Sequence, residues 1–154
     1  MLTEYVLMSI KPHFAEEILS GKKKFELRAR VAPLNSGDLV IVYASSPVKS
    51  IIGVFRAGRI FIGNYEEIVD LLRNYPRAGI TEEDLKYIAN RKREIIAVEV
   101  LAPRRLPRPI TLSEIRKLIP GFRPPVSYMK LKPTNPIVEL VMKLLKSSGG
   151  LFMD

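Results

Sequence analysis

Apolar and charged residues alternate along residues 24–31, where Phe25 and Leu27 stand between charged neighbours. Because successive side chains of a strand point to opposite faces, this alternation predicts a strand that is buried on one face. Residues 39–44 are instead almost entirely apolar, which is typical of a strand covered on both faces. Similar runs predict further strands at residues 5–10, 49–62, 94–101 and 126–131.

The segments between these strands carry apolar residues at helical spacing. Pro12 is favoured in the first turn of a helix, and Asn64 is a residue type that caps one. No repeat and no linker divides the chain, so we expect a single domain that mixes strands and helices. The helices are predicted to begin close to residues 12, 64, 81, 111 and 136.

Residues 103–109 contain three prolines and three arginines. Proline has no N–H group to donate to a strand ladder, so it is excluded from the interior of a sheet. We therefore predict that this segment lies outside the central sheet and displays its arginines to solvent.

The composition excludes several kinds of site. The 154 residues include no cysteine and one histidine, His13, so disulfides, thiolate metal sites and histidine-rich metal sites are excluded. No cofactor motif is present. No apolar run is long enough to span a membrane, and the N-terminus lacks the pattern of a signal peptide. We expect a cytoplasmic protein that is not bound to a membrane.

The net charge of +9 indicates an anionic partner. Residues 22–59 carry eight basic residues against two acidic ones, and residues 100–133 carry eight against one. The stretch between them is nearly balanced, so the excess charge is concentrated in two blocks. Solvated strand faces and a charge-rich surface like that of thermophile proteins are the alternative explanations of this pattern.

The most distinctive stretch lies where the first predicted helix gives way to a strand. Gly21 can close the helix, and Glu26 and Arg28 then share one face of the strand. Lys23 can join them only from the turn before the strand or from a bulge. These three side chains form either a polar site or a surface ion pair with a solvated lysine.

The spacing of Gly21, Lys23, Glu26 and Arg28, GxKxxExR, resembles the signature of the activating signal cointegrator homology (ASCH) domain family. A late segment containing Ser127 and Tyr128 is similar to a second motif of that family. The resemblance extends over residues 5–131 and implies an α+β fold of the PUA-like type, a small mixed β-barrel with flanking helices.

We therefore assign residues 1–133 to an ASCH, PUA-like domain and residues 134–154 to a C-terminal helical extension packed on the same domain. The extension lies beyond the resemblance, and a dimer contact is the alternative role for its helix. We expect a monomer or a weak homodimer.

Members of this family are mostly inferred to bind RNA, so the resemblance and the charge together favour RNA or a nucleotide-like ligand in a basic cleft. Base recognition would require aromatic stacking, for which Tyr43, Phe122 and Tyr128 are candidates. The predicted ligand-binding residues are Gly21, Lys22, Lys23, Glu26, Arg28, Lys49, Arg104, Arg105, Arg123, Ser127 and Tyr128.

The alternative is a small hydrolase in the same cleft, because relatives with this fold are reported to act on modified nucleosides or on RNA. Lys23 would then be a base or nucleophile, Glu26 a proton carrier and Arg28 an oxyanion donor. The amidohydrolase-like relatives carry threonine in place of Glu26, which weighs against deacylation here. An adaptor role, which the family name suggests, is neither supported nor excluded by the sequence.

Overall fold

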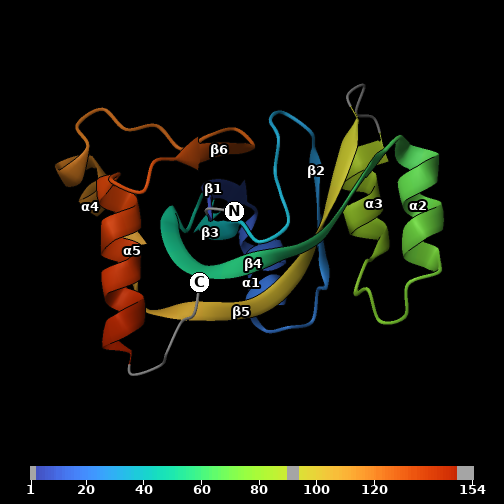
Figure 1. The fold of residues 1–154 in the computed structure, drawn as a ribbon, viewed down its shortest axis with the longest axis horizontal. Helices are drawn as coiled ribbons and strands as arrows, with labels where there is room; N and C mark the ends of the chain where they lie inside the picture. Colours follow the sequence, from blue (N-terminus) through green and yellow to red (C-terminus); the bar gives the residue numbers. More distant parts are fainter. Residues whose placement is uncertain (1–2, 90–93, 149–154) are drawn as a thin grey trace.

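The computed structural model describes residues 3–89 and 94–148, which form a six-stranded mixed sheet curved into a half-barrel (Figure 1). The order across the sheet is β2-β5-β4-β3-β1-β6. Strands β1 and β3 pair in parallel, and the other four pairs are antiparallel. The strands are β1 (Tyr5–Ile10), β2 (Phe25–Ala29), β3 (Leu39–Ala44), β4 (Ser50–Gly63), β5 (Ile95–Thr111) and β6 (Tyr128–Leu131).

The helices begin where the sequence predicts them. Asn64 caps its helix by a reciprocal capping box with Glu67, and the Thr111 hydroxyl accepts from the Glu114 N–H. None of the helices in the described residues is both long and apolar enough to cross a membrane. The helices are α1 (Pro12–Leu19), α2 (Tyr65–Arg73), α3 (Glu82–Ala89), α4 (Leu112–Leu118) and α5 (Pro136–Ser147).

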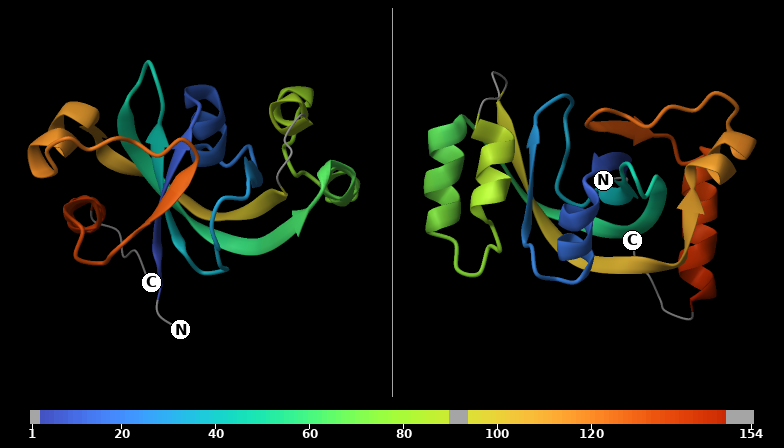
Figure 2. Two further views of the ribbon diagram at one scale, coloured as in Figure 1. Left: turned by 90° about the horizontal axis from the view of Figure 1, so that it is seen from above. Right: turned by 180° about the vertical axis from the view of Figure 1, so that it is seen from behind.

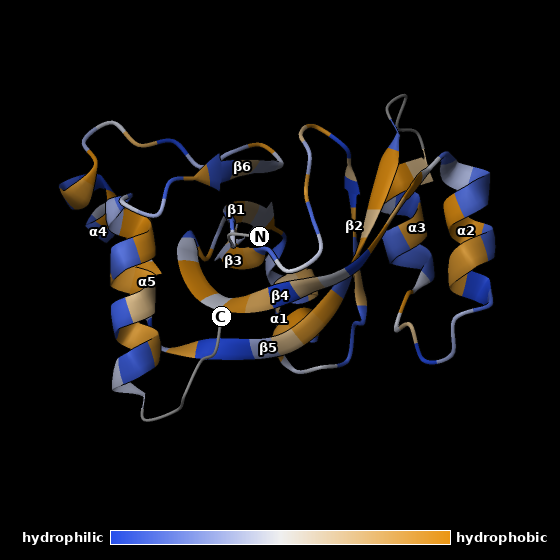
Figure 3. Ribbon diagram, viewed as in Figure 1, coloured by the Kyte–Doolittle hydropathy of each residue, from blue (hydrophilic) through white to orange (hydrophobic). Residues whose placement is uncertain are grey.

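Three apolar cores hold these elements together, as the orange bands on the sheet and inner helix faces show (Figure 3). The first core lies between α1 and the concave side of the sheet. The second joins α4 and α5 to β1 and β3, with Val141 and Leu145 of α5 fully buried in it. The third joins α2 and α3 to β2 and the first part of β5. The helix pairs therefore sit at opposite ends of the molecule (Figures 1 and 2).

The prediction that residues 103–109 lie outside the sheet was wrong. Strand β5 runs through them to Thr111 and pairs with β4 there, with Gly53 opposite Arg105. Strand β2 pairs with the part of β5 up to Glu99, so among the described strands the later part of β5 has β4 alone as its neighbour. Prolines are tolerated in such a one-sided strand because no second ladder needs their N–H groups.

Candidate functional site

The signature residues begin in the turn that joins α1 to β2. Gly21 adopts a φ of 81°, the left-handed conformation that ends a helix, and the N–H groups of Lys22 and Lys23 both donate to the carbonyl of Glu17. Lys23 therefore lies in the turn before the strand, one of the two positions from which it can reach Glu26. The turn directs the Lys23 side chain inward and leaves Lys22 exposed.

Four charged side chains meet beneath the sheet edge, and we call them the signature cluster: Lys23, Glu26, Arg28 and Asp84. Lys23 Nζ lies 2.8 Å from Glu26 Oε1 and 2.6 Å from Asp84 Oδ1. Arg28 Nη1 donates to Glu26 Oε2 at 3.3 Å. Only 2% of Lys23, 2% of Glu26, 3% of Arg28 and 2% of Asp84 is exposed, so these residues are not a surface ion pair.

Asp84 is the member of the signature cluster that sequence reasoning missed. It lies in the first turn of α3, where acidic residues are already explained by the helix dipole. Its Oδ2 accepts from the N–H and hydroxyl of Thr81 at 2.8 and 2.9 Å, while its Oδ1 faces Lys23. The sequence feature that could have identified Asp84 is its spacing of four from Ile88, which places both residues on one helix face. These two are the buried residues of α3.

Gly79 brings α3 close to the signature turn. A Cβ atom at this position would lie 2.1 Å from the carbonyl oxygen of Lys22, and its φ is 72°. Next to it, the carbonyl of Ala78 accepts from the N–H of Lys24 at 2.8 Å. The absence of a side chain at Gly79 therefore allows Asp84 to reach Lys23.

The protonation state of Lys23 follows from its partners. Burial disfavours its charge, but the carboxylates of Glu26 and Asp84 outweigh burial and hold the pKa of the ammonium above its usual range. Lys23 is therefore protonated at neutral pH, with its Nζ 4.2 Å from the centre of the Phe14 ring. A protonated lysine donates hydrogen bonds, and it must lose its proton before it can act as a base or nucleophile.

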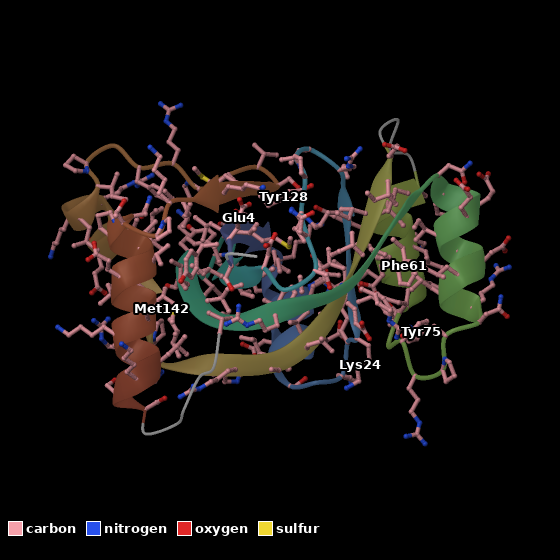
Figure 4. The ribbon with its side chains drawn as sticks, viewed as in Figure 1. Glu4, Lys24, Phe61, Tyr75, Tyr128 and Met142 are labelled. Carbon is pink, nitrogen blue, oxygen red and sulfur yellow. The ribbon has the colours of Figure 1, made fainter. Side chains whose placement is uncertain are left out.

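Arg28 and Tyr128 connect the two edge strands of the sheet, β2 and β6. Arg28 Nη2 donates to the carbonyl oxygen of Ser127 at 3.3 Å and lies 3.4 Å from its hydroxyl. The hydroxyl of Tyr128 accepts from the N–H groups of Val31 and Ala32 and donates to the Ala32 carbonyl. Tyr128 is only 5% exposed, on β6 near the loop that follows β2 (Figure 4). In this arrangement its ring packs in the core and does not offer a face to a base.

The other two candidate aromatic residues, Tyr43 and Phe122, are also buried, in the core beneath α4. Burial raises the pKa of Tyr43, and the positive charge of Arg116 opposes that shift. Neither ring presents an open stacking face in this conformation.

The remaining predicted basic contacts are distributed over the surface. Lys22, Lys49, Arg105 and Arg123 are exposed, and Arg105 pairs with Glu16 of α1. Arg104 is half-buried and donates to the carbonyl of Leu145, which ties β5 to the end of α5. The structure thus brings Lys23, Glu26, Arg28 and Ser127 together but places these other residues outside the signature cluster.

A second polar site lies between the turn before β4 and helix α4, at the end of the molecule opposite α2 and α3 (Figure 1). Lys49 and Arg116 contribute positive charge to this pocket of about 490 Å³, and no carboxylate or imidazole is among its described lining residues. Lys49 has a φ of 50°, and its carbonyl accepts from the N–H of Leu112, which fixes the turn to α4. We call this the basic pocket, and its lining residues are Pro47, Val48, Lys49, Ser50, Thr111, Leu112, Ser113 and Arg116.

Sequence reasoning identified Lys49 but not Arg116, which lines the same pocket. Arg116 Nε donates to the carbonyl of Phe122 at 3.1 Å, which orients the guanidinium. Arg116 lies in the last turn of α4, where basic residues are favoured by the helix dipole, so its presence there did not point to a binding site. Within residues 3–89 and 94–148, no group of three or more metal-binding side chains is arranged to hold a metal ion.

Comparison with known proteins gives one family over most of the chain. The family model described as the ASCH domain matches residues 8–102. A protein of Zymomonas mobilis subsp. mobilis described as an ASCH domain-containing ribonuclease is 28% identical over 140 residues, which cover 90% of this chain and 93% of that protein.

Solved structures agree with this result. The crystal structure of ASCH from Zymomonas mobilis matches with a TM-score of 0.73 at 26% identity, covering 93% of this chain and 94% of that one. The N-terminal domain of Staphylothermus marinus McrB matches with a TM-score of 0.59 at 15% identity, covering 93% of this chain and 95% of that one, and shares the fold alone.

Proposed function

Because this chain belongs to the ASCH domain family, we propose that it is an RNA-binding domain whose phosphate contacts are made at the basic pocket. The observation that carries the proposal is the presence of both Lys49 and Arg116 in the lining of one pocket that has no carboxylate among its described lining residues. The related protein described as a ribonuclease supports RNA as the ligand class.

The chemistry of the basic pocket suits a phosphodiester backbone. Two cations attract phosphate oxygens and release counterions, which makes affinity depend steeply on salt. The hydroxyls of Ser50, Thr111 and Ser113 add donors for phosphate or ribose oxygens. The exposed Lys22, Arg105 and Arg123 extend the basic surface beyond the pocket.

The signature cluster has a different role in this proposal. Its four residues are buried and balanced, with two positive and two negative side chains, so it offers RNA no free charge. We assign it the task of holding the turn, β2 and the start of β6 in one arrangement. In this proposal these residues support the RNA-binding surface from within, whereas the sequence prediction placed them in the RNA cleft itself.

The test is binding of a short single-stranded RNA, compared with the matching duplex RNA and single-stranded DNA, over a series of salt concentrations. We expect single-stranded RNA to be preferred and the preference to persist at moderate salt. Equal binding of all three ligands that disappears with salt would show only a basic surface, and would contradict the proposal.

RNA cleavage is the second candidate function, and the name of the related ribonuclease favours it. Incubation of single-stranded RNA with the wild-type protein and with Lys49→Ala, purified in the same way, tests it. Cleavage by the wild type alone would support activity at the basic pocket, and equal cleavage by both would indicate another site or a contaminant. Hydrolysis with Lys23 as base is disfavoured because the pKa of this buried ammonium is raised.

A further inference from the structure

The loop between α4 and β6 displays an apolar side chain that is almost completely open to solvent. Val126 is 99% exposed, whereas the other large apolar residues exposed in the described part of the chain reach at most 45%. Single exposed apolar residues are common, so exposure alone does not indicate a partner. The backbone around Val126 gives the further evidence.

The residues on both sides of Val126 are anchored. The carbonyl of Pro125 accepts from the hydroxyl of Ser9 at 2.7 Å. The carbonyl of Ser127 accepts from the N–H of Ser9 at 2.9 Å and from Arg28 Nη2 at 3.3 Å. Valine also has few side-chain rotamers, because it branches at Cβ. The side chain of Val126 is therefore held outward in one arrangement.

We propose that Pro124, Pro125 and Val126 contact unpaired bases of single-stranded RNA, and that Arg123 contacts a phosphate beside them. We call these four residues the proline segment. The inference rests on the RNA-binding function proposed above and extends that function from the backbone of the RNA to its bases.

The chemistry of the proline segment suits an unpaired base. Single-stranded RNA exposes the faces of its bases, and apolar side chains, proline among them, pack against such faces. The aromatic candidates Tyr43, Phe122 and Tyr128 are buried, so in this structure they leave that contact to other residues. Proline rings and a β-branched side chain lose little conformational entropy on binding, which favours affinity.

The proline segment is continuous with the basic pocket. Arg116 lines that pocket, and its Nε donates to the carbonyl of Phe122 at 3.1 Å. Phe122 directly precedes the proline segment, and the chain from there to Val126 spans at most about 14 Å. The loop then continues from α4 to β6 (Figure 1). One short RNA strand can therefore contact both surfaces.

The charge of Arg123 is available to a phosphate. Arg123 is exposed and makes no ion pair within residues 3–89 and 94–148. Other exposed arginines pair with carboxylates, namely Arg30, Arg59, Arg105 and Arg108. An arginine without a carboxylate partner next to an exposed apolar side chain offers a phosphate contact and a base contact together.

Val126→Ser tests the base contact, because it removes the apolar surface and leaves the anchored backbone in place. Ile62→Ser is the control, since it makes a similar change at an exposed site on β4 next to α2, at the opposite end of the molecule. The probes are a single-stranded RNA and an RNA of equal length whose central nucleotides lack bases. We expect Val126→Ser to bind the first RNA about fivefold more weakly than Ile62→Ser does, with the same salt dependence. Both variants should bind the second RNA equally.

Two results would overturn the base contact. Equal affinity of Val126→Ser and Ile62→Ser for the complete RNA would leave this surface to a protein partner. Equal weakening of both RNAs by Val126→Ser would show an effect that does not involve bases.

Arg123→Ala tests the phosphate contact. We expect it to weaken binding of both RNAs and to reduce the slope of log affinity against log salt by about 0.7. An unchanged slope would overturn the role of Arg123.

The same measurements separate this inference from the function on which it rests. Binding that depends on Lys49 and not on Val126 overturns the base contact alone. Binding that depends on Val126 and not on Lys49 overturns the basic pocket alone. Absence of RNA binding by the wild type overturns both.

Discussion

The signature cluster and the basic pocket use the same cationic residue types, a lysine and an arginine, in opposite environments. Lys23 and Arg28 are buried with two carboxylates, whereas Lys49 is exposed and shares its pocket with Arg116. Charges that are matched inside the protein stabilise one arrangement of its chain. Charges that remain unmatched by carboxylates at the surface are available to an anionic polymer. Under the proposed function, the charged residues of a sequence motif need not be the ones that contact the ligand.

Replacement of Lys23 is expected to give the largest effect. Lys23→Met leaves Glu26 and Asp84 as buried carboxylates without their shared cation, which typically costs about 3–5 kcal/mol. Urea denaturation measures the loss in the free energy of unfolding. A loss below about 1 kcal/mol would contradict the buried network, since exposed ion pairs contribute no more than that.

Gly79 and Gly21 illustrate two different reasons for a glycine. One is the close approach of a neighbouring backbone segment, and the other is a backbone conformation that glycine favours. Both glycines have a positive φ, but a Cβ atom has open space at Gly21 and would overlap the Lys22 carbonyl at Gly79. We expect Gly21→Ala to cost about 1 kcal/mol and Gly79→Ala on the order of 3 kcal/mol. Thermal or urea unfolding of the two variants measures the difference. Equal losses would show that α3 does not depend on its contact with the signature turn.

Tyr128 is expected to contribute to stability through its hydroxyl group. Tyr128→Phe leaves the N–H groups of Val31 and Ala32 without their acceptor, which costs about 1–3 kcal/mol where these groups stay buried. Equilibrium unfolding measures the cost, and RNA affinity of the folded variant should stay unchanged. Weaker RNA binding without a change in stability would instead make Tyr128 a ligand contact.

Much of this molecule could be predicted because local patterns determine it. The alternation around Phe25 and Leu27, the cap at Asn64 and the spacing of the signature residues each depend on neighbours in sequence. They gave the elements, their order and the position of Lys23 in the turn. The family resemblance then supplied the α+β arrangement, which the comparisons confirm.

What could not be predicted depends on contacts between distant segments. Asp84 already had a local explanation at a helix start, so nothing in its neighbourhood pointed to Lys23. The continuation of β5 through three prolines depends on the length of β2, because the described part of β2 does not reach the later residues of β5. Tyr128 is buried because its strand, β6, lies close to the loop that follows β2 at the other edge of the sheet. The sequence pattern gives no information on such a contact between distant segments.

The most direct test of the account is the salt dependence of RNA binding by Lys49→Ala. Lys86→Ala is the control, because Lys86 is exposed on α3 at the opposite end of the molecule (Figure 1). The account predicts that Lys49→Ala weakens binding of single-stranded RNA and reduces the slope of log affinity against log salt by about 0.7, the share of one phosphate contact on a single strand. Lys86→Ala should keep the wild-type slope and affinity. An unchanged slope and affinity in Lys49→Ala would contradict the claim that the basic pocket holds the RNA backbone.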